Sequence, residues 1–311
     1  MPTPGSKRTG TSSAGNSPRC APDMNDLASM LDDLTNDKRR FGVFAIDHRD
    51  SLRAFVRPDD PDSLTAQEIT DLKDQMVRAI APDATGVMLE PEYSIPQLID
   101  SGAKPVTIGF TAALEAQGYL GDPEKGPTEL LDGWSVEQAK ASGASCAKLL
   151  LPYRPDRPLA EAQEQVGREV VAECNRVGIP VVLEPLFYQL DDPSLRPKLV
   201  LETAQRFAAM SPDLLKLPFP VDPSDPDEDH WFAACRTISE IATMPWVLLS
   251  GGGSFDTYLR QVEVAVKAGG SGFMVGRALW GEAALASPDE RPALLEEVVR
   301  PRMRQLREII D

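Results

Sequence analysis

The chain contains only two histidines and four cysteines among its 311 residues, and these residues are not grouped. The histidines are His48 and His230, and no cysteine pair has the C-x-x-C spacing. Since a zinc site usually needs three or four histidine, cysteine or carboxylate ligands, this composition argues against a zinc enzyme. We expect no metal or cofactor, although carboxylate ligation of Mg²⁺ stays open. The scattered thiols favour reduced cysteines in a cytoplasmic protein.

Long apolar runs and an excess of basic residues are also missing. No run reaches the roughly 18 apolar residues that a membrane-spanning helix needs. Residues 1–24 are polar and small and lack the apolar segment of a secretion signal, so we expect a disordered tail there. The net charge is −16, from 32 basic and 48 acidic side chains. Such a charge repels nucleic acid and anionic membranes, which excludes both as expected partners.

From residue 41 onward, short apolar runs alternate with amphipathic stretches, which indicates βα repeats around a parallel sheet. The expected strands are 42–47, 85–90, 105–110, 146–151, 180–184, 213–218, 245–250 and 271–275. Helical patterns between and after them include 65–80, 135–142, 159–177, 198–210, 231–242, 255–268 and 291–310. Eight such units favour one (β/α)8 barrel, a TIM barrel, over residues 25–311. An open doubly wound sheet is the alternative, but no G-x-G-x-x-G follows the first strand.

Polar side chains recur where the apolar runs end, and a barrel would gather these positions at one face. They are Asp47, Glu90, Lys148, Glu184, Lys216, Ser250 and Arg277. Lys216 interrupts an apolar strand and has no neighbouring carboxylate along the chain. Burial lowers the pKa of a lysine, and a neutral amine is the nucleophile of Schiff-base chemistry. The alternative is a strand-edge lysine that extends into solvent.

Other strand-end residues suit the same chemistry. Lys148 repeats the pattern two strands earlier, and a second inward cation would favour the neutral form of one of the two lysines. Its alternative role is to pair with Glu184 or Asp47, which is compatible with catalysis. Glu184 is a candidate for proton transfer, or alternatively an ion-pair partner of a lysine. Asp47 is expected to orient a substrate hydroxyl, to hold a lysine or to cap a helix. Glu90 and Glu92 are expected to be structural.

Glycines follow the last two expected strands, in Ser250-Gly251-Gly252-Gly253-Ser254 and in Gly276-Arg277. Backbone N–H groups at glycines can approach a phosphate, and the loops after strands 7 and 8 of a barrel commonly bind one. A tight turn without a ligand is the alternative. His48 is expected to donate a hydrogen bond in the pocket, whereas His230 is expected to be solvated. The predicted phosphate-binding residues are Ser250, Gly251, Gly252, Gly276 and Arg277.

The chain from about residue 41 resembles the class I aldolases of the tagatose-1,6-bisphosphate aldolase and sulfofructose-1-phosphate aldolase family. The resemblance is carried by FAIDHRDSL, GVMLEPEY, LDGWSVEQAKASGASCAKLLLPY, PVVLEPLFY, DLLKLPFPV and the segment from MPWVLLSGGG to AGGSGFMVGRALWGEA. It implies that Lys216 forms a Schiff base among Asp47, Lys148 and Glu184. It also implies that Ser250, the glycines that follow it and Arg277 bind phosphate. The implied reaction cleaves a ketose 1-phosphate to dihydroxyacetone phosphate and an aldehyde.

The substrate expectation depends on the branch of this family. The family usually has glutamine where this chain has His48, which bears on the distal specificity of the pocket. The middle segments resemble the tagatose-bisphosphate branch, and the segment from MPWVLLS to VGRALW resembles the sulfofructose branch. The first expected substrate is 6-deoxy-6-sulfofructose 1-phosphate, which yields 3-sulfolactaldehyde; tagatose 1,6-bisphosphate, which yields glyceraldehyde 3-phosphate, is the alternative. A non-catalytic sugar-phosphate sensor is an alternative of another class, and a homo-oligomer is expected.

Overall fold

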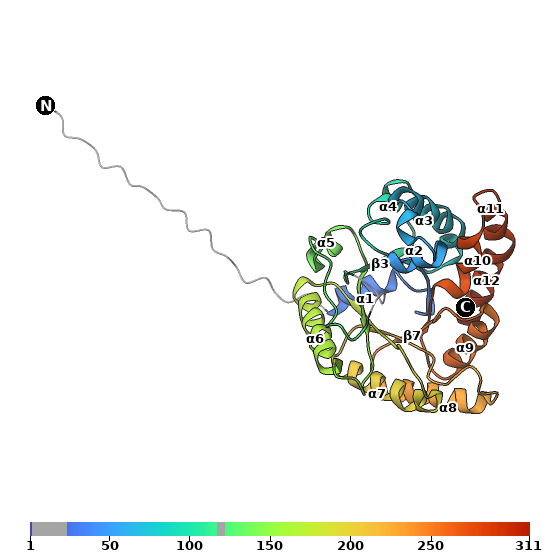
Figure 1. The fold of residues 1–311 in the computed structure, drawn as a ribbon. Helices are drawn as coiled ribbons and strands as arrows, with labels where there is room; N and C mark the ends of the chain where they lie inside the picture. Colours follow the sequence, from blue (N-terminus) through green and yellow to red (C-terminus); the bar gives the residue numbers. More distant parts are fainter. Residues whose placement is uncertain (2–23, 117–121) are drawn as a thin grey trace.

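The computed structural model describes Met1, residues 24–116 and residues 122–311. Eight parallel strands form a closed barrel in chain order, with β8 paired to β1, and helices surround it (Figure 1). The strands are β1 Phe41–Ala45, β2 Gly86–Leu89, β3 Gly109–Ala113, β4 Cys146–Pro152, β5 Val181–Leu186, β6 Leu214–Leu217, β7 Trp246–Leu249 and β8 Gly272–Val275. The predicted (β/α)8 barrel is therefore confirmed, while the predicted disordered tail falls almost wholly outside the described residues.

The helices begin and end at signals that the sequence carries. Thr65 and Ser135 form capping boxes with the residues three positions on, and Gly178 ends α6 in the left-handed conformation at φ 77°. The main helices are α1 Met24–Asp32, α2 Asp50–Val56, α3 Ala66–Ile80, α4 Gln97–Asp100, α5 Val136–Ala141, α6 Ala160–Val177, α7 Arg196–Ala208, α8 Glu228–Ile241, α9 Phe255–Lys267, α10 Arg277–Leu285, α11 Arg291–Leu294 and α12 Arg300–Ile310. None of the described helices is long and apolar enough to cross a membrane.

Two predicted elements need correction. The third strand was expected at 105–110, but β3 spans Gly109–Ala113. The apolar residues around Val106 belong instead to a surface turn, in which the Val106 side chain is 97% exposed. Pro105 has no N–H to donate to a sheet. The expected helix 291–310 is divided into α11 and α12 by a π-helical turn at Leu295–Val299. Pro301 lies next to that turn and cannot make the regular helical hydrogen bond.

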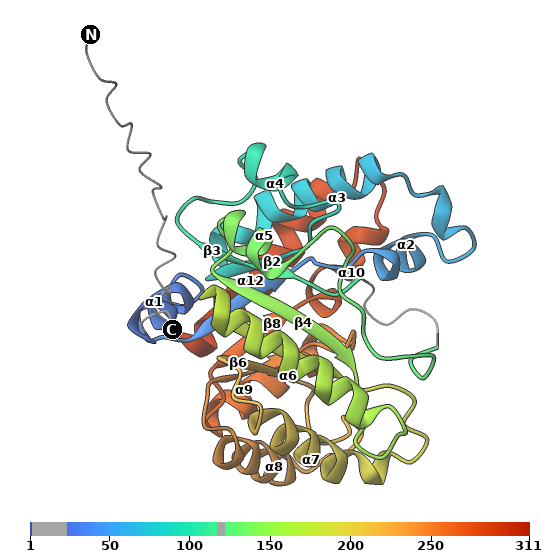
Figure 2. The same ribbon diagram turned by 90° about the vertical axis from the view of Figure 1, so that its left-hand side faces the viewer.

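Segment 24–36 covers the barrel end at which the strands begin. Leu34 is fully buried, its carbonyl accepts the Thr85 hydroxyl at 2.7 Å, and the Gly109 N–H donates to the Asp33 carbonyl at 2.8 Å. Figure 2 shows α1 beside the C-terminus of α12 at this end of the molecule. The segment closes one end of the barrel, so its other end is left for a ligand.

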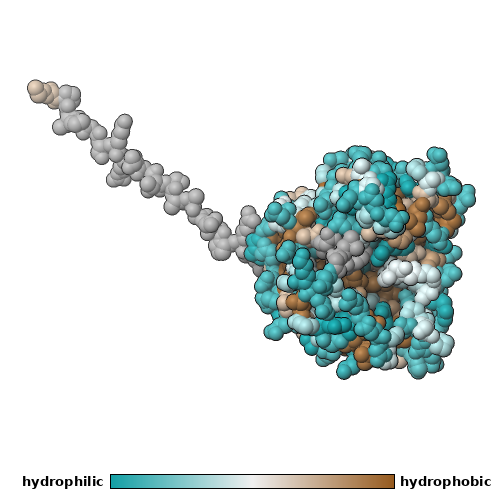
Figure 3. Space-filling view, in the orientation of Figure 1, coloured by the Kyte–Doolittle hydropathy of each residue, from teal (hydrophilic) through white to brown (hydrophobic). Residues whose placement is uncertain are grey.

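The barrel interior has an apolar layer and a charged layer. Because successive side chains on a strand face opposite sides, Cys146 and Lys148 of β4 point inward while Ala147 and Leu149 pack against the outer helices. The inner apolar cluster contains Leu34, Phe41, Val43, Ala45, Met88, Cys146, Val182, Leu214, Val247 and Met274. Most of the outer surface facing the viewer in Figure 3 is hydrophilic, with smaller hydrophobic areas between. Inside the barrel, charged side chains such as Lys148 lie above the inner apolar cluster, nearer the C-terminal ends of the strands.

Candidate active site

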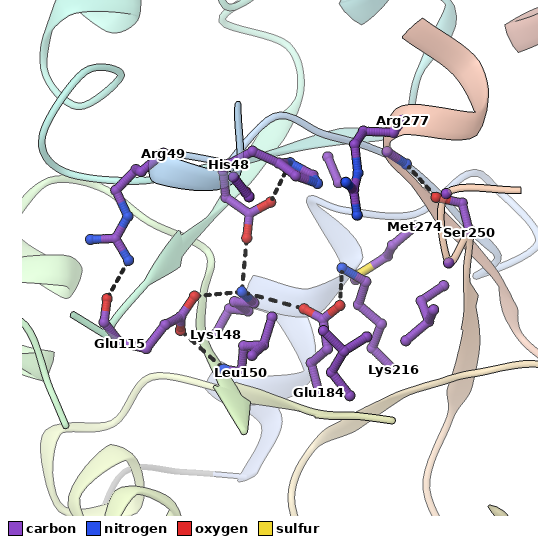
Figure 4. Close-up of a pocket in the computed structure, with 18 of the residues that line it drawn as sticks. His48, Arg49, Glu115, Lys148, Leu150, Glu184, Lys216, Ser250, Met274 and Arg277 are labelled. Atoms are coloured by element: carbon purple, nitrogen blue, oxygen red, sulfur yellow. Dashed lines mark hydrogen bonds and ion pairs between the residues drawn. The ribbon is translucent and has the colours of Figure 1, made fainter. Parts of the chain in front are cut away.

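A cavity of about 230 Å³ opens where the strands end (Figure 4). Its walls combine strands β1, β4, β5, β6, β7 and β8 with the loops that follow β1, β3, β5, β7 and β8. All ten site residues predicted from the sequence line it, namely Asp47, His48, Lys148, Glu184, Lys216, Ser250, Gly251, Gly252, Gly276 and Arg277. The structure thus brings these residues together around one cavity.

Lys216 lies on β6 with its side chain inside the barrel and 5% exposed. Its Nζ is 2.8 Å from Glu184 Oε1 and donates to the Met88 sulfur at 3.6 Å. The alternative of a strand-edge lysine in solvent is therefore wrong. The carboxylate that the sequence around Lys216 lacks is supplied by the neighbouring strand β5.

Lys148 binds three carboxylates. Its Nζ lies 2.8 Å from Asp47, 2.5 Å from Glu115 and 3.3 Å from Glu184. Burial alone would lower the pKa of Lys148, but these charges outweigh it and raise that pKa above its ordinary value. Likewise, burial would raise the pKa of Asp47, yet the Lys148 and Lys216 charges lower it. Lys148 is therefore a fixed cation beside the second lysine of the cavity.

Glu184 joins the two lysines. One carboxylate oxygen faces Lys216 at 2.8 Å, and the other lies 3.3 Å from Lys148 without a hydrogen bond among the described residues. An ion-pair partner and a proton-transfer group were the two interpretations from the sequence. The geometry satisfies the first and allows the second, because a carboxylate in contact with an amine can exchange a proton with it.

Glu115 is a site residue that the sequence analysis missed. It lies two residues beyond β3, where one oxygen contacts Lys148 and the other accepts the Leu150 N–H at 3.0 Å. The guanidinium of Arg49 donates to the Glu115 carbonyl and, at 2.8 Å, to Glu92. Placing the third strand at 109–113 would have revealed Glu115 as a carboxylate at a strand end, like Glu184.

Glu90 and Glu92 lie behind the cavity rather than in it. Glu90 is fully buried, forms an ion pair with Lys73, and accepts the Ser94 hydroxyl and the Glu92 N–H at 2.7 Å each. Lys73 is also fully buried, and burial lowers its pKa although Glu90 opposes that shift. These contacts fix the loop after β2, which agrees with the structural role predicted for both glutamates.

The loops after β7 and β8 form a glycine-rich cradle. Gly251 and Gly252 have positive φ angles of 57° and 77°, and a Cβ at Gly252 would lie 3.6 Å from a guanidinium nitrogen of Arg277. The Gly276 N–H donates to Ser250 Oγ at 3.1 Å, which ties the two loops together. Since Arg277 begins α10, its charge adds to the positive end of the helix dipole. The cradle suits an anion such as phosphate.

His48 lies between the charged cluster and this cradle. Its Nδ1 is 3.6 Å from Asp47 Oδ1, and its ring contacts the edge of Trp280 at a centroid distance of 5.2 Å. Burial lowers the pKa of His48 to about 3, with the Arg277 charge acting in the same direction and Asp47 against it. The imidazole is therefore neutral near pH 7. His230 is solvated as predicted, with 67% of its side chain exposed.

No group of three or more histidine, cysteine, aspartate and glutamate side chains is arranged to hold a metal ion in the part of the chain that the structure describes. The carboxylates that converge in the cavity instead share Lys148 as their counter-charge. Cys146, Cys174 and Cys235 are buried free thiols, and Cys20 lies outside the described residues. Burial raises the pKa of Cys174 above its ordinary value, which makes this thiol unreactive.

A buried lysine and carboxylate at the open end of a (β/α)8 barrel, next to an anion cradle, define the arrangement of a class I aldolase. The family comparison agrees with that class. The model of the DeoC/LacD family aldolases matches residues 42–282, about three quarters of the chain. The chain therefore belongs to the DeoC/LacD aldolase family and is a carbon–carbon lyase.

Individual relatives are more distant. Tagatose 1,6-diphosphate aldolase 1 of Enterococcus faecalis is 29% identical over 278 residues, which cover 82% of this chain and 84% of that protein. Tagatose 1,6-diphosphate aldolase of Listeria monocytogenes serovar 1/2a is 27% identical over 277 residues, covering 81% and 80%. Among solved structures, a Schiff-base-forming fructose-1,6-bisphosphate aldolase has a TM-score of 0.62 at 18% identity, covering 92% of this chain and 100% of that chain. Fructose-bisphosphate aldolase from Plasmodium falciparum has a TM-score of 0.72 at 14% identity, covering 93% and 97%. At these identities the solved structures establish the fold alone.

Proposed function

We propose that this aldolase cleaves a ketose 1-phosphate between C3 and C4 through a Schiff base on Lys216, giving dihydroxyacetone phosphate and an aldehyde. The observation that carries the proposal is the buried Lys216 amine, 2.8 Å from Glu184 within the cavity. A lysine that is shielded from water and touches a carboxylate has both the nucleophile and the proton acceptor that imine formation needs.

The first half of the reaction forms the iminium. Lys216 transfers a proton to Glu184 and its free amine attacks the substrate C2 carbonyl, which gives a carbinolamine. Glu184 then returns the proton to the C2 hydroxyl, water leaves, and the C2–nitrogen double bond forms. Glu184 is suited to both transfers because it contacts Lys216 directly and stays within 3.3 Å of the fixed Lys148 charge.

The second half breaks the carbon–carbon bond. A carboxylate removes the proton of the C4 hydroxyl, the aldehyde leaves, and the C3–C4 electron pair moves into an enamine on Lys216. Glu184 is our first choice for this base and Asp47 our second, while Lys148 stabilises negative charge on the C4 oxygen. Protonation of the enamine at C3 and hydrolysis of the iminium release dihydroxyacetone phosphate and restore Lys216.

The cradle of Ser250, Gly251, Gly252, Gly276 and Arg277 is proposed to bind the C1 phosphate. We expect Arg277→Ala to raise KM at least about tenfold with a smaller change in kcat, because a charge-assisted contact to phosphate is lost. Steady-state release of dihydroxyacetone phosphate measures both constants. Arg236→Ala, which removes an exposed arginine of α8, is the matched control. An unchanged KM in Arg277→Ala would remove the phosphate assignment.

The two candidate substrates carry the same C1 phosphate but differ in the group at C6 and in the configuration at C4. The resemblance of the C-terminal third supports 6-deoxy-6-sulfofructose 1-phosphate, which would place the enzyme in sulfosugar catabolism. The curated relatives named above are tagatose 1,6-diphosphate aldolases, which supports tagatose 1,6-bisphosphate as the second candidate. Parallel assays with both sugars decide between them by the ratio of their kcat/KM values.

The decisive experiment is borohydride reduction in the presence of each sugar phosphate, followed by intact-protein mass spectrometry and peptide mapping. A Schiff-base aldolase gains the mass of the reduced adduct on Lys216. A non-catalytic sugar-phosphate sensor binds the same ligands without a covalent adduct, so an unmodified protein would overturn the proposal.

The proposal also places the enzyme in the cytoplasm as a homo-oligomer. The buried free thiols suit a reducing compartment. Light scattering after size-exclusion chromatography measures the oligomeric state, and a monomer at micromolar concentration would remove that part.

A further inference from the structure

We propose that His48 recognises the phosphate-bearing half of the substrate, donating one hydrogen bond to the C1 phosphate and accepting another from the C3 hydroxyl. This inference rests on the proposed function and adds a specificity-determining residue to it. From the sequence, His48 was expected to bear on the specificity for the distal end of the substrate. The structure places it instead beside the cradle that is proposed for the C1 phosphate.

The His48 ring lies beside the cradle that is proposed for the C1 phosphate. A Cβ at Gly276 would lie 3.1 Å from His48 Cε1, 3.5 Å from its Nε2 and 3.6 Å from Ser250 Oγ, so this ring edge faces the Gly276–Ser250 hydrogen bond that ties the two cradle loops together. In Figure 4 His48 lies along the same side of the cavity as Arg277, opposite Lys216. An anion in the cradle would therefore lie next to Nε2.

The other ring nitrogen, Nδ1, is the proposed acceptor for the C3 hydroxyl. His48 Nδ1 is buried and has no hydrogen-bond partner among the described residues. The carboxylate of Asp47 lies 3.6 Å away, which is beyond hydrogen-bond distance. A buried polar atom without a hydrogen bond costs free energy, so a ligand group that forms a hydrogen bond with Nδ1 is favoured. Nδ1 also lies on the side of the ring that faces Asp47, the second of the two carboxylates proposed to act at C4.

The chemistry of the ring matches these two neighbours. A neutral imidazole has one N–H donor and one acceptor nitrogen. A phosphate oxygen requires a donor, and a hydroxyl can supply one, so the tautomer protonated on Nε2 satisfies both. The ring is held in place by Trp280, whose indole N–H donates to the Ala45 carbonyl at 3.0 Å. It therefore offers a preorganised pair of hydrogen bonds rather than another charge.

The test uses the condensation direction, because it separates the two halves of the substrate. KM is measured for dihydroxyacetone phosphate and, independently, for the aldehyde that the wild-type enzyme accepts. His48→Leu removes both hydrogen bonds, and His48→Gln keeps one donor and one acceptor. His230→Gln, at the exposed second histidine, is the matched control.

We expect His48→Leu to raise KM for dihydroxyacetone phosphate about tenfold or more, while KM for the aldehyde changes less than about twofold. His48→Gln is expected to recover most of this loss. Equal affinities in His48→Leu and wild type, or a change confined to the aldehyde, would overturn the proposal. So would a His48→Gln variant as impaired as His48→Leu at an unchanged melting temperature.

Failure of the proposed function gives a different pattern. If wild type forms no borohydride-reduced adduct with dihydroxyacetone phosphate, the Schiff-base proposal itself fails. If wild type and His48→Leu form the adduct at the same half-saturating concentration, only the role of His48 is overturned.

Discussion

Replacing Lys216 by alanine is expected to abolish aldol cleavage and leave the barrel folded. The variant has no amine to form the iminium, so kcat should fall at least about 10⁴-fold. Glu184 retains the Lys148 charge at 3.3 Å, so its carboxylate is not left without a counter-charge when Lys216 is removed. Release of dihydroxyacetone phosphate measures the loss, and thermal unfolding monitored by circular dichroism measures the fold.

Two further variants separate the amine from its charge. Lys216→Arg keeps a cation in the cavity without a nucleophilic amine, and we expect it to be as inactive as Lys216→Ala. Lys267→Ala removes an exposed lysine at the end of α9 and should behave as wild type. Cleavage by Lys216→Ala at close to the wild-type rate would show that this amine is not the nucleophile.

The fold could be predicted because its strands are buried on both faces and read as short apolar runs between amphipathic helices. The failure at β3 has the same origin. The true strand, Gly109–Ala113, has Phe110 as its one large side chain and otherwise small residues, whereas the surface turn before it contains the β-branched Val106 and Ile108. Few large side chains suffice in β3 because closure of the barrel, not local propensity, supplies its partners.

The members of the site could be predicted, but their pairing could not. A strand end is visible in the sequence, so Lys148, Glu184 and Lys216 were identifiable as residues of one face. Which lysine receives three carboxylates depends on strand order and register, since Leu150 is paired with Glu184 and places that glutamate between β4 and β6. Glu115 was missed because the third strand was expected to end at residue 110, which left this carboxylate five residues beyond the expected strand end.

Replacing Lys148 by methionine is expected to affect stability and turnover together. The substitution leaves Asp47 and Glu115 buried without the cation that now lies within 2.8 Å of each. Removing one partner of a buried ion pair typically costs about 3–5 kcal/mol of unfolding free energy. We also expect kcat to fall at least about 100-fold, because the fixed charge proposed to stabilise the C4 oxygen is lost. Urea unfolding and steady-state assays measure the two effects.

The loss of stability in Lys148→Met should grow as the pH rises. In wild type the lowered pKa of Asp47 gives a contribution that is present above the unfolded value near 4 and lost in acid. In the variant, Asp47 stays buried but loses the Lys148 charge, so its pKa rises and the folded state binds a proton that it must release as the pH increases, which costs stability. The two effects have the same sign, and the difference between wild type and variant should be larger at pH 8 than at pH 5.

A double-mutant cycle with Glu115→Gln tests whether the carboxylate cluster causes this loss. Removing one buried charge should cost less stability in Lys148→Met than in wild type, because in the variant that charge has lost its partner. Lys267→Met serves as the exposed control for the substitution itself. Additive losses in the cycle, or a pH-independent difference between wild type and Lys148→Met, would show that Lys148 acts through packing rather than as the counter-charge of the cavity.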